Sequence, residues 1–554
     1  MINDPQLNDF SYFNRTDQIK RLQEEHFDLI IVGGGITGAG IALDAASRGM
    51  KTALVEKKDF ASGTSSKSTK LIHGGLRYLK QLHFKMVADV GRERRTVHKL
   101  APHLVLPEKM LLPVLKNGSM GMFSISVGLK LYDLLADVRG DDKRRMLGKR
   151  STLQEEPLLP GDRIKGSGLY AEYRTDDARL TIEIIKTAHQ HGATCLNYVE
   201  VKEFMYDNDQ VSGVKCTDTL SRLSLQIKGQ KIINAAGPWV DDIRSLNNSR
   251  RGKQLFITKG VHIVVPQEKL PLHHSMYFEV EDGRMIFLIP RDQITYIGTT
   301  DTPYKGNKDD ILVEKEDAEY LINAVNAMFP DVRLEIGDIQ SSWAGIRPLV
   351  FEEGKSASEI SRKDEIFVST TGLVSMAGGK LTGYRKMAKK VVDKIAKELS
   401  RKGNRNFTAC KTLRIPLNDN DFNGSADVYA YSESIKKSLN IREIPEMYAP
   451  YLVHNYGRQA ELIINQLDQF KDEDIEFALL QSELAYCLDC EMVCKPLDFF
   501  ERRTGRLYFW INTVQKYKNN VLQVFKDKMK WSEEQFAEEV NILERTLKRS
   551  REFY

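Results

Sequence analysis

Three things are scarce in this sequence: long apolar runs, cysteine, and an excess of charge of one sign. No apolar run reaches the length of about 18 residues that a membrane-spanning helix needs, so any membrane contact is expected to be peripheral. Six cysteines in 554 residues, with no charged-then-apolar leader before residue 27, predict a reducing, cytoplasmic location rather than secretion. A net charge of +5, from 81 basic and 76 acidic residues, argues against a nucleic-acid partner and against disorder.

The cysteines do not indicate a metal site. The spacing of Cys487, Cys490 and Cys494 places them on one face of a predicted helix. An iron–sulfur cluster needs a fourth thiolate nearby, and the nearest other cysteine in the sequence is Cys410. We therefore expect no metal and interpret the three residues as buried free thiols, with a metal or redox role as the alternative.

The most informative segment runs from Phe27 to Glu56 and reads as an apolar strand, a glycine turn, a helix and a second strand that ends in an acid. Gly33 allows the tight turn, Gly35 lets the backbone approach a pyrophosphate, and Gly38 allows close packing of helix on strand. The N-terminus of the helix offers free N–H groups to the phosphates. Glu56, about 20 residues beyond the glycines, is placed to accept the hydroxyls of an adenosine ribose. This unit predicts an ADP-containing cofactor.

The length of the chain predicts three or four domains, because a domain averages about 150 residues. Residues 1–26 are predicted to form a polar N-terminal leader, and residues 401–554 a helical domain rich in charged residues. Alternating apolar residues between 255 and 300 predict an antiparallel sheet. The remaining predicted ranges are 27–100, 165–255 and 362–400 for a discontinuous cofactor domain, and 101–164 and 256–361 for a substrate domain.

Two later segments indicate that the cofactor is a flavin. In IINAAGPWV a strand ends in small residues, among them Ala236 and Gly237, that can lie against a flat ring. In GLVSMAGGKLTGYRK, Gly378 and Gly379 precede a long helix that is predicted to open at Lys380. The N-terminus of such a helix would stabilise the anion that forms on a reduced flavin.

A third segment, residues 61–79, supports the same interpretation. It is a loop of small residues after the acid-ended strand, and we expect it to pass the phosphates of the cofactor. The loop would bring Arg77 and Tyr78 to the flavin ring. Thr64, Ser65 and Ser66 of this loop are expected to contact the cofactor.

Together these motifs resemble the FAD-dependent glycerol-3-phosphate dehydrogenase family, which has the fold of the D-amino acid oxidase group. The resemblance is carried by ITGAGIALDAASRG, KLIHGGLRYL, NAAGPW, IGTTD, GIRPL and GGKLTGYRK. It covers residues 25–395 and extends more loosely to DFFERRTGRLYF near the C-terminus. It implies an α/β protein with a Rossmann-type FAD-binding domain, an antiparallel-sheet substrate domain and a C-terminal helical domain.

Position within these motifs also implies roles for individual residues. The expected catalytic residues are His262, Arg347 and Lys380. The expected substrate contacts are Arg77, Tyr78, Arg347 and Arg362. The expected cofactor contacts are Gly33, Gly35, Gly38, Glu56, Thr64, Ser65, Ser66, Ala236, Gly237, Gly378, Gly379, Lys380 and Thr382.

The implied reaction suits these residue types. Glycerol 3-phosphate is a small dianion, and guanidinium groups hold a phosphate in a fixed pose. Oxidation at C2 removes a hydride and a hydroxyl proton, so a base is required, and His262 is our candidate. Lys380 is expected to polarise the oxygen or to balance charge on the reduced cofactor. The alternatives are a packed core histidine for His262 and surface ion pairs for Arg347 and Arg362. Trp239 is interpreted as a core residue.

The leading expectation is an FAD enzyme that oxidises sn-glycerol 3-phosphate to dihydroxyacetone phosphate and passes electrons to a membrane quinone. One alternative is the same oxidation with oxygen as acceptor, which releases hydrogen peroxide. A second alternative is a flavin-binding scaffold without turnover. The sequence leaves open whether the protein forms a homodimer.

The expected location is cytoplasmic, with peripheral contact at the inner face of the cell membrane. The candidate membrane face is residues 120–150, where apolar residues precede a basic stretch that would sit at anionic headgroups. The basic residues are Lys143, Arg144, Arg145, Lys149 and Arg150. The alternative is a helix packed into the substrate domain beside a solvated basic loop.

Overall fold

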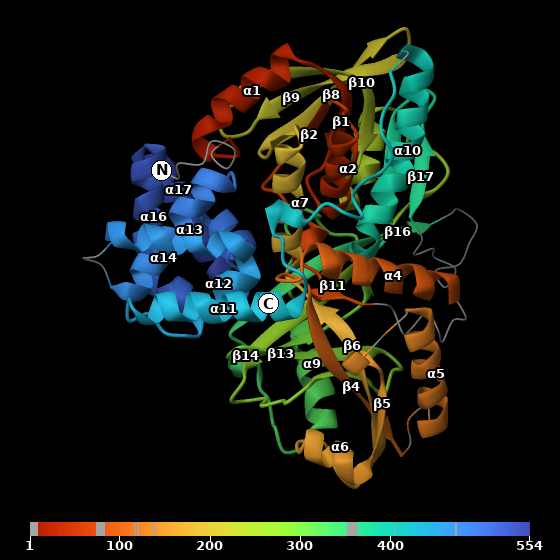
Figure 1. The fold of residues 1–554 in the computed structure, drawn as a ribbon, viewed down its shortest axis with the longest axis vertical. Coiled ribbons are helices and arrows are strands. Elements are labelled where there is room, and N and C mark those ends of the chain that lie inside the picture. Colours follow the sequence, from red (N-terminus) through yellow and green to blue (C-terminus); the bar gives the residue numbers. More distant parts are fainter. Residues whose placement is uncertain are drawn as a thin grey trace.

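The computed structural model of the chain describes residues 9–73, 84–116, 118, 121–136, 138, 140–351, 364–403, 405–470 and 474–553. Three expected substrate contacts, Arg77, Tyr78 and Arg362, lie outside these residues. Two sheets lie one above the other, and a block of helices flanks them on one side (Figure 1).

An eight-stranded sheet forms the nucleotide-binding half of the molecule. Its order is β17-β18-β10-β1-β2-β7, with β8 and β9 attached through β10. The run from β18 to β7 is parallel, and β1 is buried from Phe27 onward, as a strand covered on both faces should be. The bounds are β1 His26–Val32, β2 Thr52–Val55, β7 Thr194–Leu196, β8 Val199–Asp207, β9 Gln210–Asp218, β10 Ser224–Asn234, β17 Glu365–Val368 and β18 Val374–Ala377.

Helix α2 (Ile36–Ser47) packs between α7 (Asp177–Gln190) and α10 (Tyr384–Gly403). Its small residues permit close approach: a Cβ on Gly40 would meet the ring of Tyr384 at 2.7 Å. Helix α1 (Arg15–Glu24) lies against β7 and β10. Arg15 is buried and donates to Asn197 and Asp218, so the described part of the predicted leader packs onto this half of the molecule.

A ten-stranded sheet forms the second half. Its order is β15-β11-β14-β13-β12-β4-β6-β3, with β16 paired to β11 and β5 to β6. The pairs are antiparallel except β12 with β4. The predicted boundary at residue 165 falls within β6, which pairs with β4, and the nucleotide half resumes with α7. The bounds are β3 Leu71–Ile72, β4 Leu106–Leu115, β5 Arg145–Gly148, β6 Ile164–Arg174, β11 Gln254–Pro266, β12 Ser275–Glu279, β13 Met285–Arg291, β14 Ile294–Gly298, β15 Thr302–Pro303 and β16 Ser341–Phe351.

Shorter helices connect and cover these strands. They are α4 Phe84–Leu100, α5 Met122–Leu135, α6 Lys149–Glu155, α8 Val240–Leu246 and α9 Lys315–Met328. Single 3-10 turns are η1 Tyr12–Asn14, η2 Thr64–Ser66, η3 Gly140–Asp142, η4 Gly237–Trp239, η5 Ile336–Asp338, η7 Leu381–Gly383, η8 Leu417–Asp419, η9 Gly457–Gln459 and η10 Leu467–Phe470.

The C-terminal region is helical, as predicted. It comprises α11 Ser425–Asn440, α12 Tyr448–Tyr456, α13 Ala460–Gln466, α14 Ile475–Cys490, the π-helix η11 Asp498–Arg503, α15 Arg506–Phe509, α16 Ile511–Met529 and α17 Glu533–Arg549. Its core is continuous with that of the ten-stranded sheet, where Phe509 packs on Tyr296 and Trp343. Among the described residues, no helix is both long and apolar enough to cross a membrane.

The three neighbouring cysteines are buried, unbridged thiols. Burial raises the pKa of Cys487 and of Cys494, so both are protonated at neutral pH. Within the described ranges, no group of three or more His, Cys, Asp or Glu side chains could hold a metal ion.

Candidate active site

The glycine turn joins β1 to α2 at the carboxyl end of the parallel sheet. Gly33 has φ +114°, a left-handed conformation that favours glycine, and a Cβ there would meet the carbonyl oxygen of Ala235 at 2.6 Å. A Cβ on Gly38 would meet the carbonyl oxygen of Gly33 at 1.9 Å, so this glycine lets the helix lie against the strand. Gly35 is the N-cap of α2 and lines a cavity. Gly33 and Gly38 therefore lie in the turn and in the helix–strand contact as predicted, whereas the approach of a pyrophosphate to Gly35 stays a prediction.

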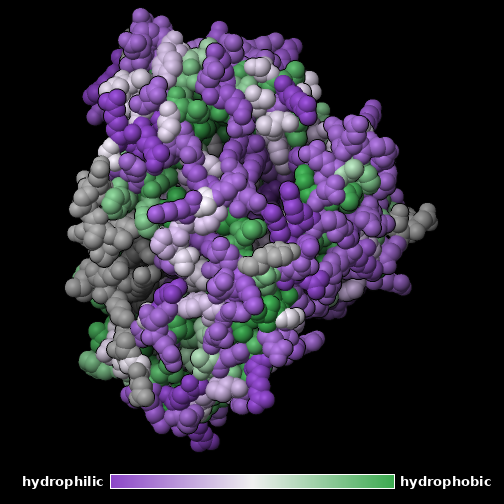
Figure 2. Space-filling view, turned by 180° about the vertical axis from the view of Figure 1, so that it is seen from behind, coloured by the Kyte–Doolittle hydropathy of each residue, from purple (hydrophilic) through white to green (hydrophobic). Residues whose placement is uncertain are grey.

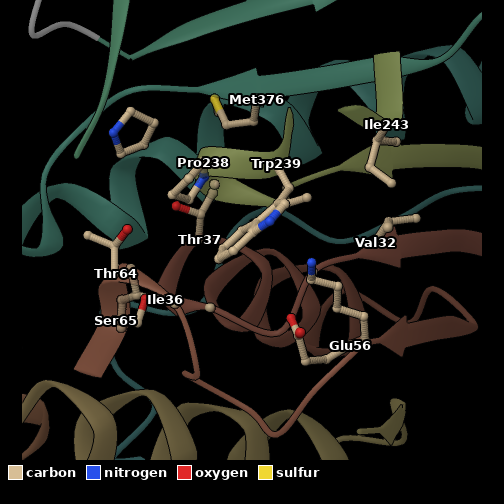
Figure 3. A pocket seen from close by; sticks show the side chains of 18 of the residues that line it. Val32, Ile36, Thr37, Glu56, Thr64, Ser65, Pro238, Trp239, Ile243 and Met376 are labelled. Carbon is tan, nitrogen blue, oxygen red and sulfur yellow. Dashed lines mark hydrogen bonds between the residues drawn. The ribbon is translucent and has the colours of Figure 1, made fainter. Parts of the chain in front are cut away.

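The cavity has a volume of about 370 Å³ and lies between the glycine turn, five other segments and Pro348. The segments are 55–57, 62–68, 199–201, 235–246 and 376–381. Figure 3 shows Glu56 toward one end, Thr64 and Ser65 toward the other, and Trp239 between them. The walls include the expected cofactor contacts Gly33, Gly35, Glu56, Thr64, Ser65, Ala236, Gly237, Gly378, Gly379 and Lys380. Three others do not line it: Gly38 acts in packing, and Ser66 and Thr382 are buried beside the wall.

Glu56 follows β2 and is held by the backbone. Its two carboxylate oxygens accept from the N–H groups of Gly34, at 2.7 Å, and Lys58, at 3.0 Å. Burial raises its pKa, and the two backbone donors oppose that rise. A carboxylate has about four lone-pair positions, so Glu56 retains acceptor capacity toward the cavity that it lines.

The long helix expected at Lys380 begins slightly later than predicted. Lys380 is the N-cap of the 3-10 turn η7, and α10 starts at Tyr384. Gly378 and Gly379 have φ +74° and +87°, which turn the chain from β18 into η7. The start of η7, with Lys380 and Leu381, therefore lines the cavity in place of the start of α10.

Trp239 is a correction to the sequence analysis. We interpreted it as a core residue, but its ring lines the cavity (Figure 3). The ammonium group of Lys57 lies 4.4 Å from the ring centroid, and the indole N–H points to Asp309 at 3.4 Å. Neither partner is adjacent in sequence, so no local pattern indicated this position.

His262 lies on β11 and is almost fully buried. Its ring stacks on Trp343 of the neighbouring strand β16, with centroids 4.8 Å apart. Nε2 lies 3.0 Å from the hydroxyl of Thr69, and Nδ1 has no partner among the described residues. Burial, followed by the positive charges of Arg347 and Lys70, holds the pKa of His262 well below its usual value. The imidazole is therefore neutral at pH 7.

Arg347 lies on β16, and its side chain is about one-third exposed. It donates to the carboxylate of Asp301 at 3.1 Å and to the hydroxyl of Thr299 at 3.0 Å. Its guanidinium occupies the space over Gly260, where a Cβ would meet it at 2.3 Å. The His262 ring lies over Gly298, and Arg347 binds the adjacent Thr299, so the structure brings these two predicted residues close together. The charge of Arg347 contributes to the low pKa of His262.

Two neighbours of this site were not predicted from the sequence. Thr69 follows the cavity-lining Ser68 and contacts His262, so it connects the cavity loop to the imidazole. Trp343 supports the imidazole ring and donates to the carbonyl oxygen of Ser68 at 3.2 Å. Thr69 is one more polar residue in a loop rich in them, and nothing in its sequence context singles it out.

The sequence matches two described protein families. Residues 28–385 match the family of FAD dependent oxidoreductases, and residues 380–536 match the C-terminal domain of alpha-glycerophosphate oxidase. The chain is 48% identical to an aerobic glycerol-3-phosphate dehydrogenase of Staphylococcus haemolyticus, covering 96% of this chain and 97% of that one. It is 47% identical to an aerobic glycerol-3-phosphate dehydrogenase of Bacillus subtilis, covering 95% of each. The chain belongs to the aerobic glycerol-3-phosphate dehydrogenase family.

Solved structures agree with this assignment. The glycerol-3-phosphate dehydrogenase from Bacillus halodurans, complexed with FAD, is 41% identical and superposes with a TM-score of 0.84, covering 98% of this chain and 99% of that one. The L-alpha-glycerophosphate oxidase from Mycoplasma pneumoniae is 20% identical with a TM-score of 0.55, covering 70% and 97%, and shares the fold. The fold class predicted from the sequence is confirmed. The oxidase alternative is not favoured, because the relatives with 41 to 48% identity are dehydrogenases and the oxidase is only 20% identical.

As a member of this family the protein is an FAD-dependent oxidoreductase. Its cavity fits that cofactor: the N-terminus of α2, where the N-cap Gly35 has no side chain, suits a pyrophosphate, and an acid at the end of β2 suits an adenosine ribose. Membership in an enzyme family also argues against the scaffold without turnover. The roles assigned to individual residues stay predictions.

Proposed function

We propose that this protein oxidises sn-glycerol 3-phosphate to dihydroxyacetone phosphate and passes the electrons to a membrane quinone. The observation that carries the proposal is that a neutral imidazole and a guanidinium lie on neighbouring strands next to the cavity: His262 contacts Thr69, which follows the cavity-lining Ser68, and Arg347 precedes the cavity-lining Pro348. His262 and Arg347 come from paired antiparallel strands, and Thr69 links His262 to the loop that lines the cavity. The names of the relatives supply the substrate class.

Arg347 is the proposed phosphate ligand. A guanidinium holds a phosphate through parallel N–H donors, and its charge is permanent at any working pH. Thr299 and Asp301 hold this side chain in place over Gly260. The substrate phosphate would take donors from Arg347. Arg77 and Arg362, the other arginines proposed to bind the substrate, lie outside the described residues.

His262 is the proposed base for the C2 hydroxyl. It is neutral at working pH because its pKa is depressed, so an acceptor lone pair is present on one ring nitrogen. We propose that the hydroxyl proton passes to Nε2, the nitrogen that already faces the Thr69 hydroxyl. Trp343 fixes the plane of the ring, so the imidazole does not have to reorient.

Bound FAD supplies the acceptor for the hydride that leaves C2. Lys380 lies in the cavity wall at the N-terminal end of η7 and α10, and we propose that its ammonium group balances negative charge that develops there. The helix N-terminus adds positive potential at the same place.

A quinone acceptor requires a surface that meets the membrane, and α5 is the proposed surface. Ile125, Leu129 and Tyr132 face inward, whereas Phe123, Val127 and Leu134 share the opposite side and are 82, 51 and 76% exposed. In Figure 2, hydrophobic atoms reach the lower left edge, where the half turn places α5. Exposed cations follow in sequence at Lys143, Arg145, Lys149 and Arg150. An apolar stripe beside cations suits an anionic lipid surface.

An anaerobic titration tests the reaction. Adding sn-glycerol 3-phosphate to the purified yellow protein without oxygen should bleach the flavin absorption with one substrate per FAD, and dihydroxyacetone phosphate should form. A water-soluble quinone should then restore the colour. Persistence of the yellow colour would overturn the proposed activity, whereas bleaching followed by fast reoxidation in air with one peroxide per turnover would support the oxidase instead.

A further inference from the structure

The C-terminal domain contacts the loop that lines the FAD cavity through the π-helix η11 and through Tyr508 of the following helix α15. Most helices hydrogen-bond from residue i to i+4, and the wider π turn is rare and frequently found at functional sites. In η11 the residues Asp498–Arg503 are all buried. Three of its side chains, Glu501, Arg502 and Arg503, bind residues of the loop 57–69, which follows Glu56 and carries six of the residues that line the cavity.

The first anchor is Asp59. Its carboxylate is fully buried and accepts from Arg502 at 2.6 Å, from Arg503 at 2.7 and 3.0 Å, and from Asn197 at 2.9 Å. Burial opposes its ionisation, but Arg503 and Arg502 keep its pKa below the ordinary value. Arg503 also donates to the carbonyl oxygen of Glu491 at 2.9 Å. A buried carboxylate with four donors fixes the start of the loop firmly.

The second anchor is Lys67, near the other end of the loop. Its ammonium group binds the carboxylate of Glu501 at 2.5 Å and the hydroxyl of Tyr508 at 2.7 Å. Tyr508 donates to the same carboxylate at 2.6 Å. Glu501 is buried, yet Lys67 and Arg502 lower its pKa to about 2, so the anchor is ionised at any working pH.

Between these anchors the loop presents its other side to the cavity. The hydroxyl of Ser65 accepts from the N–H of Ile36 in the first turn of α2, at 2.9 Å. The hydroxyl of Thr64 donates to the carbonyl oxygen of Ile346 at 2.7 Å, one residue before Arg347. The loop ends at Thr69, which contacts His262. A shift of the loop would therefore move both the cofactor wall and the partner of the proposed base.

We propose that η11 is a positioning element for the cofactor: Arg502 and Arg503 through Asp59, and Glu501 through Lys67, hold the loop 57–69 in the conformation that binds FAD. This gives the C-terminal domain a role at a site that it does not line, since the cavity-lining residues all precede residue 382. The inference rests on FAD as cofactor and does not depend on the identity of the substrate.

The experiment compares two identical substitutions in the full chain. Glu501→Gln removes the charge that binds Lys67. Glu483→Gln is the matched control, because Glu483 is equally a buried C-terminal carboxylate. Among the described residues it binds Arg506, Tyr451 and Tyr456 and no residue of the loop. Apoprotein prepared from each variant is titrated with FAD, and thermal unfolding of the same apoprotein is recorded.

We expect Glu501→Gln to weaken FAD binding by about tenfold, the size of a typical coupling between separate sites, and Glu483→Gln to change it less than twofold. Equal weakening by the two variants, or none by Glu501→Gln, would overturn the proposal, because the first outcome is a general loss of stability and the second shows no coupling. Neither measurement uses glycerol 3-phosphate. The result therefore does not depend on whether the protein oxidises that substrate.

Lys67 provides a milder second test, since Lys67→Met leaves Glu501 paired with Arg502. Lys67→Met should weaken FAD binding as Glu501→Gln does, and Lys67→Arg, which keeps the charge, should restore most of it. The double variant Lys67→Met with Glu501→Gln should be no weaker than either single one, because both remove the same contact. Additive losses would contradict the proposed pathway through this ion pair.

Discussion

At the scale of single residues, Arg347 is the side chain whose proposed role is most directly measurable. Replacing it by methionine keeps much of its length and removes the charge. We expect kcat/KM for sn-glycerol 3-phosphate to fall by an amount equivalent to about 2 to 5 kcal/mol, as for other truncated charge contacts, while FAD stays bound. Steady-state kinetics and the flavin spectrum measure the two quantities.

Arg284 offers a matched control. Like Arg347 it is a partly exposed arginine of the same half of the molecule, paired with an aspartate, here Asp282 at 2.8 Å. Arg284→Met should leave kcat/KM within about twofold, since a surface pair contributes little. Equal kcat/KM values for the two variants would mean that Arg347 forms an ordinary surface ion pair and does not bind the substrate phosphate.

His262 predicts the pH dependence of the reaction. Its folded pKa is depressed, so the imidazole stays neutral, and able to accept a proton, as the pH falls through 6.5. The acid limb of kcat/KM should therefore lie below pH 6.5. Because the charge of Arg347 contributes to the low pKa of His262, the acid limb should move to higher pH in Arg347→Met.

His262→Asn should lower kcat by about a hundredfold or more. The proposal would be contradicted if the acid limb did not move in Arg347→Met and His262→Asn kept full activity. His262 would then be a packed core residue without a catalytic role.

At the scale of elements, the nucleotide-binding unit depends on the close contact between α2 and β1. Gly38→Ala would place a methyl group 1.9 Å from the carbonyl oxygen of Gly33, so helix and strand must separate. We expect the unfolding free energy of the apoprotein to fall by about 1 to 3 kcal/mol, as for other overpacked sites, and FAD affinity to fall with it. Denaturant unfolding and FAD titration measure both.

Gly128→Ala is the control for this substitution. Gly128 lies in α5, and a Cβ there would meet nothing within 4 Å. The same change should therefore be neutral or stabilise by up to about 1 kcal/mol, the helix preference of alanine over glycine. Similar losses at Gly38 and Gly128 would show that the close contact at Gly38 carries no special cost.

At the scale of the whole molecule, the exposed stripe of α5 and the basic stretch after it predict binding to anionic vesicles. Binding should weaken with salt and when Lys143, Arg144 and Arg145 are replaced by glutamate. Replacing Phe123 and Leu134 by serine should weaken it independently of salt, because these side chains are largely exposed and apolar. Co-sedimentation with liposomes of mixed zwitterionic and anionic lipid measures the binding.

The control reverses three exposed lysines of the other sheet, Lys202, Lys215 and Lys228, which lie on β8, β9 and β10. This variant has the same net charge as the first and should bind as the unaltered protein does. Equal weakening by both charge reversals would mean that net charge alone drives the association. Binding untouched by either reversal would place the membrane face elsewhere.

Local pattern accounts for the elements that were predicted correctly. The strand at Phe27 and the helix after it follow from apolar runs, the turn follows from the left-handed conformation of Gly33, and the helix–strand contact follows from the missing side chain of Gly38. The strands β11, β13 and β14 follow from alternation of apolar residues. The position of Lys380 before a helical N-terminus also came from local signals, although the 3-10 turn that delays α10 did not.

The sequence by itself determined the class of cofactor, the fold class and the family, because those depend on short motifs and their order along the chain. Only the tertiary structure decided what surrounds each motif residue. Thr69 reaches His262, Trp239 enters the cavity, and Glu501 binds Lys67 across hundreds of residues. Such contacts depend on strand register and on the packing of distant helices, and burial gives them their strength by removing water from the charges involved.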